Sequence, residues 1–214
     1  MLKEITQKAK LVTFEGLDGS GKTLQIHRLC KYLNDTGRPT IVFREPGSGD
    51  LNEELRRLLL ATEKHPLVDA LLFNAARMNN IFTNIKPALE DGTNVLMDRF
   101  IDSTYVYQAH GTEFVTEILA LEDMVTKHVY IDRTFYLDVS IAEANKRINL
   151  RPYDEVAGRN DLKTDEWKRN ILRGYKYRLN QCAGRMIHIN ADKPSDDVWH
   201  IIKTLADSIF KPAI

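Results

Sequence analysis

The segment from Gly16 to Thr23 constrains the fold of this chain more than any other part of its sequence. Its letters, GLDGSGKT, fit the pattern G-x-x-x-x-G-K-[ST] and follow an apolar run, Leu11 to Phe14, that predicts a buried strand. In this pattern, backbone N–H groups converge on phosphate oxygens, the lysine reaches the terminal phosphates, and the Ser/Thr hydroxyl faces Mg²⁺. A chance glycine-rich turn is the alternative, but a strand before the motif and a helix after it favour a phosphate-binding loop. The sequence therefore predicts binding of a nucleoside triphosphate.

Apolar runs alternate with helical patterns along the chain, which is typical of a parallel sheet covered on both faces. We expect strands at 11–15, 40–43, 94–98, 133–138 and 186–190. We expect the first helix over 22–35, with Gly37 as its left-handed stop. Further helical spacing runs from Leu51 to Leu59 and from Leu67 to Asn74, with Pro87 and Asp91-Gly92 closing the latter segment. The prediction is an α/β fold: one domain over 1–214 with a doubly wound, parallel five-stranded sheet flanked by helices in three layers, and with ligands at the carboxyl ends of the strands.

Composition limits the partners of the chain. Its 214 residues include 30 basic and 30 acidic side chains, so no electrostatic attraction to DNA, RNA or an anionic membrane is expected. Cys30 and Cys182 lack a C-x-x-C spacing, so neither a disulfide framework nor a zinc site is predicted. No signal-peptide core and no stretch near the roughly 18 apolar residues of a membrane span is present, and a cytoplasmic location is expected.

Charged residues follow two of the predicted strands. Arg44 and Glu45 precede Pro46-Gly47, which forces a turn, and Asp98 and Arg99 end the strand over 94–98. An acid at this edge suits a magnesium shell, and the adjacent arginine could bridge two phosphoryl groups as charge develops between them. Taken alone, Asp98 and Arg99 are also compatible with a surface ion pair.

Two classes of P-loop protein fit these features, a GTPase-like switch and a small-molecule kinase. The chain has no Asn-Lys-x-Asp motif for reading guanine, which weakens the first. A kinase must shield the phosphoryl group from water, usually with a mobile lid that carries arginines. The segment 147–161 is the predicted lid, and its arginines are Arg147, Arg151 and Arg159. Because arginines on loops are more often merely solvated, the pattern alone leaves their role open.

Together these motifs resemble the thymidylate kinases, which transfer the terminal phosphate of ATP to dTMP. The resemblance runs from about Leu11 to Trp199. It is carried by Gly16 to Thr23, Arg44-Glu45-Pro46-Gly47, Leu71-Leu72-Phe73 with Arg77, Asp98-Arg99-Phe100, Ser103-Thr104 with Tyr107-Gln108, Arg159 with Asp161, and Gly174-Tyr175. It implies dTMP kinase activity for DNA precursor synthesis, with ATP as co-substrate, Mg²⁺, and a homodimer formed through helices beside the sheet, for which the apolar stretch 68–82 is available.

The resemblance implies a pocket for dTMP. Phe73 would stack on the thymine ring, and Arg77, one helical turn later, would donate to the carbonyl edge of the ring. Thr104 and Gln108 would read the imide edge, while Tyr107 would crowd a ribose 2′-hydroxyl and so favour deoxynucleotides. Without the resemblance, core packing is the better account of Phe73, and the first turns of an ordinary helix account equally well for the segment from Ser103 to Gln108.

The resemblance also implies the residues around the acceptor phosphate. Arg44, Arg56 and Arg99 would surround it, with Arg99 closest to the transferred group, and Glu45 would help order this corner. Asp18 would approach the sugar 3′-hydroxyl or the magnesium shell.

On the ATP side, the implied contacts come from the phosphate loop and two lid arginines. They are Gly16, Leu17, Asp18, Gly19, Ser20, Gly21, Lys22, Thr23, Arg147 and Arg159. The implied catalytic residues are Lys22, Arg99, Asp18 and Arg151. Family members with glycine at the position of Gly19 take their catalytic arginine from the lid, and Arg151 is the first candidate here, with Arg147 as the second. Thr23 and Asp98 would hold Mg²⁺, directly or through water.

The chain departs from the family pattern at four places. Ser48-Gly49-Asp50 replaces the usual Gly-Thr, Phe100 stands where Tyr or His is frequent, and Ala109-His110-Gly111 replaces a glycine just after Gln108. The lid is less arginine-rich than in many members and carries Gly158-Arg159-Asn160-Asp161 in place of Asp-Arg followed by an acid two places on. A relative that accepts dUMP, a 5-substituted deoxyuridylate or several deoxynucleoside monophosphates would keep the same base-pocket residues. A nucleotide-binding module without turnover is the non-enzyme alternative, and the presence of Lys22 and Arg99 argues against it.

Overall fold

A five-stranded parallel sheet forms the centre of the protein. The structure is a computed structural model that describes residues 8–150 and 163–211. The strands are β1 (Leu11–Glu15), β2 (Thr40–Arg44), β3 (Asn94–Asp98), β4 (Arg133–Asp138) and β5 (Met186–Asn190), in the order β2-β3-β1-β4-β5. All five predicted strands are confirmed, and β2 extends one residue further than expected, to Arg44.

Strand β1 lies in the middle of the sheet and is buried along its whole length. Its register places Phe14 opposite Asp98 on β3 and opposite Phe135 on β4. The edge strands β2 and β5 are only partly buried, because each has a neighbour on one side. The carboxyl ends of β1 and β3 therefore meet, which brings the phosphate loop after β1 next to the Asp98-Arg99 pair after β3.

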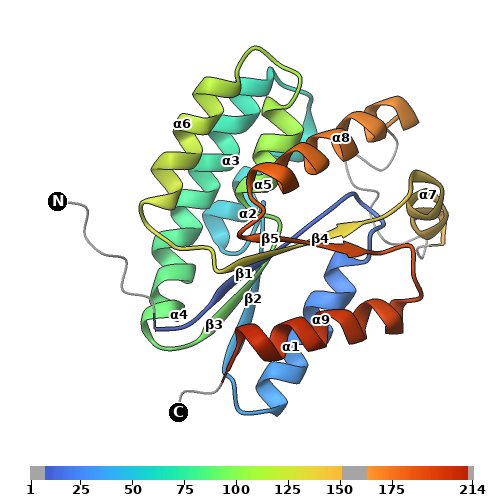
Figure 1. Ribbon diagram of the computed structural model, residues 1–214. Coiled ribbons are helices and arrows are strands. Elements are labelled where there is room, and N and C mark those ends of the chain that lie inside the picture. The colour runs from blue at the N-terminus through green and yellow to red at the C-terminus, as the bar shows by residue number, and fades with distance from the viewer. Residues whose placement is uncertain (1–7, 151–162, 212–214) are drawn as a thin grey trace.

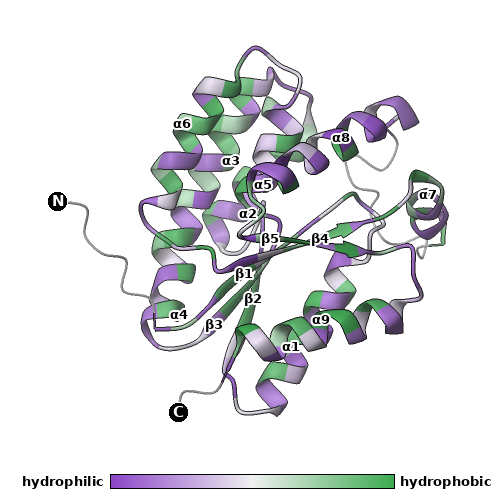
Figure 2. Ribbon diagram, viewed as in Figure 1, coloured by the Kyte–Doolittle hydropathy of each residue, from purple (hydrophilic) through white to green (hydrophobic). Residues whose placement is uncertain are grey.

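Helices cover both faces of the sheet (Figure 1). Helices α1 and α9 pack against one face, and the helices from α3 to α6, together with α8, lie on the other. Figure 2 shows the strands and the inward sides of these helices as the most hydrophobic parts of the chain. The helices are α1 (Lys22–Asp35), α2 (Asp50–Ala61), α3 (Pro66–Asn80), η1 (Ile81–Ile85), α4 (Lys86–Glu90), α5 (Ile101–Thr104), η2 (Tyr105–Ala109), α6 (Val115–Thr126), α7 (Ile141–Asn149), α8 (Asp165–Gln181) and α9 (Ser195–Ile209), where η1 and η2 are single π-helical turns. The predicted three-layer α/β fold is confirmed.

Helix α1 begins and ends where the sequence predicts. Gly37 has φ +74°, and the N–H of Arg38 donates to the carbonyl oxygen of Leu33 at 2.9 Å, which satisfies the end of the helix. The segment that follows α3 differs in one detail, because Pro87 lies inside the first turn of α4, where its missing N–H is tolerated. That segment ends at Glu90, and Gly92 has φ +87°.

No helix in the described ranges, 8–150 and 163–211, is long and apolar enough to cross a membrane.

Candidate active site

The loop between β1 and α1 is shaped by glycines that have no room for a side chain. A Cβ atom on Gly16 would lie 2.5 Å from the carbonyl oxygen of Leu137, and one on Gly19 would lie 2.6 Å from that of Ala144. Both glycines also have positive φ angles, +145° and +84°. The loop therefore lies tightly between β4 and α7, and its end leads directly into the N-terminus of α1, where backbone N–H groups favour an anion.

Lys22 is buried within this loop. Its ammonium Nζ donates to the carbonyl oxygens of Gly16 and Leu17, each at 3.0 Å. Burial, followed by the charge of Arg99, lowers the pKa of Lys22 to about 8, while Asp18 acts in the opposite direction. A bound phosphate would favour the charged form of this lysine, since an opposite charge nearby raises the pKa of an ammonium.

Thr23 and Asp98 meet at the carboxyl end of β3. The Thr23 hydroxyl donates to Asp98 Oδ2 at 2.8 Å. Hydroxyl and carboxylate oxygens are ligands that suit Mg²⁺, which usually takes one or two protein oxygens together with water and phosphate. Within the described part of the chain, no cluster of three or more His, Cys, Asp or Glu side chains is placed to hold a metal ion. The pair fits a magnesium ion that is held jointly with a nucleotide.

A cavity of about 280 Å³ lies beside the phosphate loop. This volume is near the lower end of the roughly 300–1,000 Å³ typical of small-molecule sites. Nine of the residues that were predicted to contact the acceptor or the transferred phosphate line it: Asp18, Glu45, Arg56, Phe73, Arg77, Arg99, Thr104, Tyr107 and Gln108. The structure thus brings together side chains from the loops after β1, β2 and β3 and from α2, α3, α5 and η2 around one space.

Arg77 is held in the wall of this cavity by a buried ion pair. Its Nε donates to Glu45 Oε2 at 2.7 Å, and the two side chains are 2% and 3% exposed. Its Nη1 donates to Asn74 Oδ1 and Thr104 Oγ1, and its Nη2 donates to the carbonyl oxygen of Phe100. A guanidinium has five N–H groups, and the residues described here take four of them, so one Nη2 hydrogen is left for a ligand.

The same network includes Phe100, the residue that departs from the family pattern. The guanidinium of Arg77 lies 5.2 Å from the centre of the Phe100 ring, and the ring is fully buried. Burial raises the pKa of Glu45, and Arg77 opposes that effect. Phe100 therefore makes a cation–π contact with Arg77, which requires an aromatic ring and no hydroxyl group.

Arg99 connects the phosphate loop with the cavity. Its Nη2 donates to Asp18 Oδ1 at 2.6 Å, and its guanidinium lies 5.2 Å from the centre of the Tyr107 ring. Its Nη1 donates to the hydroxyls of Ser103, Tyr107 and Tyr175 at 3.1–3.3 Å. Burial raises the pKa of Tyr107, so its hydroxyl stays protonated next to Arg99.

The other two arginines of the predicted acceptor site occupy different positions. Arg56 lines the cavity, and its Nη1 donates to the carbonyl oxygen of Pro46 at 2.6 Å. Burial, followed by the charge of Arg44, lowers the pKa of Arg56. Arg44 itself is not among the lining residues, and its Nη2 donates to Glu53 Oε1 at 3.0 Å.

The π-helical turn η2 determines which tyrosine faces the cavity. Tyr107 and Gln108 lie on η2 and line the cavity, whereas the ring of Tyr105 stacks on Tyr177 of α8 with centroids 6.1 Å apart. Single π-helical turns are frequent at functional sites. Ala109, which replaces the usual glycine, is fully buried in the core.

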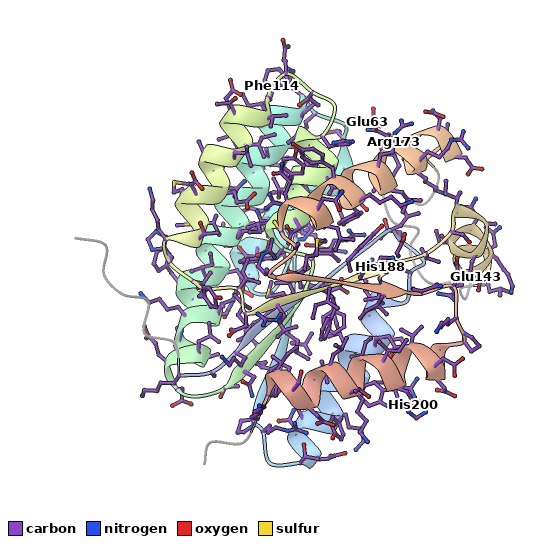
Figure 3. The ribbon with its side chains drawn as sticks, viewed as in Figure 1. Glu63, Phe114, Glu143, Arg173, His188 and His200 are labelled. Carbon is purple, nitrogen blue, oxygen red and sulfur yellow. The ribbon has the colours of Figure 1, made fainter. Side chains whose placement is uncertain are left out.

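Of the predicted lid, only the first residues lie in the described part of the chain. Arg147 lies in the last turn of α7, and its Nε donates at 2.8 Å to Oε1 of Glu143, which Figure 3 labels. Its Nη1 lies 4.0 Å from the place that a Cβ on Gly21 would occupy. Arg147 is therefore next to the phosphate loop, as an ATP contact requires. Arg151 and Arg159, predicted for catalysis and for ATP, lie outside the described residues.

Helix α8 supplies cavity residues that the sequence analysis missed. Trp167 lies in the first turn of this helix, where its N–H donates to the Thr164 hydroxyl, and its ring lies 5.6 Å from that of Tyr107. Lys163 also lines the cavity and pairs with Glu63, labelled in Figure 3. These contacts depend on how α8 packs against the rest of the protein, and a local sequence pattern does not predict that packing. The lining residues outside the predicted set are Pro46, Leu60, Lys64, Pro66, Asp69, Phe100, Ser103, Lys163 and Trp167.

One missed residue did have a local signal. Asp69 lies on α3 one turn before Phe73 and two turns before Arg77, so the three share one helix face. A helical face that carries an acid, an aromatic ring and an arginine at this spacing indicates a polar pocket.

A phosphate loop that adjoins an arginine-bearing cavity at the carboxyl edge of a parallel sheet defines a P-loop kinase for a small acceptor. Comparison with known proteins identifies the particular family. The family model for thymidylate kinase matches residues 14–202. The chain belongs to the thymidylate kinase family, whose members are ATP-dependent nucleoside monophosphate kinases.

Individual relatives agree with this assignment. A thymidylate kinase from Chlorobium chlorochromatii is 37% identical over 204 residues, which cover 90% of this chain and 92% of the relative. One from Ruthia magnifica is 36% identical, with coverages of 93% and 98%. The crystal structure of thymidylate kinase from Ehrlichia chaffeensis superposes with a TM-score of 0.72 at 31% identity and covers 92% of this chain and 98% of that structure.

Proposed function

We propose that this chain, acting as a single P-loop domain, transfers the terminal phosphate of ATP to the phosphate of dTMP at the cavity described above. The observation that carries the proposal is the position of Arg99, whose guanidinium contacts Asp18 of the phosphate loop and also lines the cavity. A cation at this position lies between the sites expected for donor and acceptor phosphates.

On the donor side, Lys22 and the backbone of the loop would bind the phosphates of ATP. Mg²⁺, held through Thr23 and Asp98, would neutralise phosphate charge. Arg147 is placed to contact ATP beside Gly21, while roles for Arg151 and Arg159 continue to rest on the family resemblance.

On the acceptor side, we assign the base of dTMP to the part of the cavity lined by Phe73, Arg77, Thr104 and Gln108. Phe73 lies where an aromatic face could stack on the base, and the remaining Nη2 hydrogen of Arg77 is available for a ring carbonyl oxygen. Gln108 and Thr104 are nearly buried and can complete the hydrogen bonds to the imide edge. Because Thr104 already accepts from Arg77, it can orient its hydroxyl hydrogen toward the base.

No general base is required for this reaction. The acceptor phosphate is largely anionic near neutral pH, so catalysis depends on in-line alignment and on stabilisation of the charge spread over the transferred group. Lys22, Arg99 and a lid arginine would provide that stabilisation. Loss of an arginine that acts in the transition state costs on the order of 10³-fold in turnover.

ADP release tests this function directly. With ATP and Mg²⁺, we expect turnover with dTMP well above that with dUMP, 5-hydroxymethyl-dUMP, dCMP, dAMP, dGMP and UMP, and we expect Arg99→Ala to lower it on the order of 10³-fold. A preference for another deoxynucleotide would keep the phosphoryl transfer and reject our assignment of the base. ATP binding without ADP release on any acceptor would instead identify a non-catalytic nucleotide-binding module.

We also propose a cytoplasmic homodimer, as the family resemblance implies. Three apolar side chains on α3 and η1 are about half exposed: Val68 (45%), Leu71 (51%) and Phe82 (49%). Burial of such a surface against a second copy would explain its composition. Sedimentation velocity should therefore show a dimer that Leu71→Glu converts to a monomer, and a monomeric parent protein would refute the proposal.

A further inference from the structure

Glu15 is a fully buried carboxylate in the middle of the site, and no sequence motif predicts a role for it. It is the last residue of β1 and immediately precedes Gly16 of the phosphate loop. A buried carboxylate is costly unless hydrogen bonds compensate for the loss of water. Hydrogen-bond donors around Glu15 must therefore compensate for the burial of its charge.

Four donors face the two oxygens of Glu15. The backbone N–H groups of Phe100 and Ser103 donate to Oε1 at 2.8 and 3.2 Å. The hydroxyls of Ser103 and Tyr175 donate to Oε2 at 2.6 and 2.9 Å. Burial, followed by the charge of Asp102, raises the pKa of Glu15, while Arg99 and the hydrogen bonds from the Ser103 hydroxyl and the Phe100 N–H act in the opposite direction.

The segment that Glu15 holds is the turn from which Arg99 projects. Arg99 has φ +69°, an uncommon conformation for a residue other than glycine. Its own N–H continues the sheet by donating to the carbonyl oxygen of Phe14 at 3.0 Å, and the next N–H, that of Phe100, donates to Glu15. Glu15 therefore fixes the backbone immediately after the left-handed residue.

Glu15 also orients the hydroxyls that contact the guanidinium. The Ser103 and Tyr175 hydroxyls, which donate to Glu15, both accept a hydrogen bond from Arg99 Nη1. Because a carboxylate only accepts, it draws both hydroxyl hydrogens toward itself and leaves the oxygen lone pairs facing Arg99. An amide at position 15 would donate to one of these oxygens and allow a hydroxyl hydrogen to turn toward the guanidinium.

We propose that Glu15 is a positioning residue for phosphoryl transfer, which holds the Arg99 turn and its two hydroxyl acceptors so that the guanidinium lies between the phosphate loop and the acceptor cavity. This inference rests on the proposed function. In this proposal Glu15 acts on Arg99, on the acceptor side of the reaction, and does not act on the bound ATP.

The test is a double-mutant cycle in the full chain with Glu15→Gln and Arg99→Ala. We expect Glu15→Gln to lower kcat with ATP and dTMP on the order of 10²-fold, the cost of misplacing a catalytic group by about 1 Å, while KM for ATP stays within about twofold. In the Arg99→Ala background the same change should lower kcat less than about threefold, because residues that act as one unit are not additive.

Asp132→Asn is the matched control. Asp132 is a buried carboxylate that accepts from the backbone N–H of Leu11, at the other end of β1 and away from the cavity. This variant should lower the free energy of unfolding without changing kcat, so a general weakening of β1 is distinguished from a loss of positioning.

Each outcome decides the inference. A kcat for Glu15→Gln within threefold of the parent value, or equal fold-losses in the two backgrounds, would overturn it. If Glu15→Gln does not fold, Tyr175→Phe removes one shared hydroxyl and should give a kcat loss of about tenfold that also disappears in the Arg99→Ala background. An inactive parent protein would instead refute the proposed function itself.

Discussion

Replacement of Arg77 by methionine should destabilise the protein strongly, because it leaves a buried carboxylate without its partner. Arg77 and Glu45 are 2% and 3% exposed and 2.7 Å apart. Methionine replaces the aliphatic part of the arginine side chain, but it is shorter and has no charge. At neutral pH the variant must either bury the Glu45 carboxylate unpaired or protonate it.

The expected cost follows from this burial. Breaking a buried ion pair by removing one partner costs about 3–5 kcal/mol. For a chain of this size, each kcal/mol lowers Tm by about 2–4 °C, which gives a decrease of about 6–20 °C. Without Arg77, the pKa of Glu45, already raised by burial, rises further. A group with a raised pKa in the folded state loses stability as pH increases, so the deficit should be larger at pH 7.5 than at pH 5.5.

Urea denaturation at the two pH values measures this effect, and the double variant Glu45→Gln/Arg77→Met is its control. The double variant should recover much of the stability and lose the pH dependence of the deficit, because no buried charge remains. Its kcat/KM for dTMP should nevertheless stay low, by about 10- to 150-fold, since a hydrogen bond from a charged donor contributes about 1.5–3 kcal/mol. A loss of stability below 1 kcal/mol in Arg77→Met, or an equal loss in both variants, would refute the reasoning.

Three further predictions concern the nucleotide sites. Because the pKa of Lys22 is about 8, the affinity for ATP should fall as the pH rises through 8 and the lysine loses its proton. Equilibrium titrations of Lys22→Arg should show no such pH dependence, even if this variant binds ATP more weakly. Asp98→Asn should raise the Mg²⁺ concentration for half-maximal activity by about 10- to 100-fold, and an unchanged value would exclude Asp98 from the magnesium shell. Phe73→Ala should raise KM for dTMP by about 5- to 150-fold through the loss of base stacking worth about 1–3 kcal/mol, while KM for ATP provides the internal control and should not change.

The sequence was sufficient to predict the strands of the sheet, because each strand has a local pattern. Each strand is a short apolar run bounded by turn residues, so all five could be located within one residue. The positions of Asp98 and Arg99 followed from the same signal, since parallel strands place their carboxyl ends at one edge. Local patterns could not show which side chains face one another across the cavity. Trp167 reaches it only through the docking of α8, some 60 residues after Tyr107 in the chain.

The contrast between Arg77 and Glu15 shows what kind of information was missing. The motif around Arg77 suggested a group that serves the base, yet four of its five N–H groups bind protein in the described structure, so its first effect is on stability. Glu15 looked like one more residue at the end of a strand, yet every hydrogen bond described for it leads to the turn that carries Arg99 or to a hydroxyl that contacts Arg99. Both roles depend on which hydrogens and lone pairs are already occupied, and that occupancy exists only when strands, loop and helix α8 are assembled. Arg77→Met should therefore lower mainly the free energy of unfolding, whereas Glu15→Gln should lower mainly kcat.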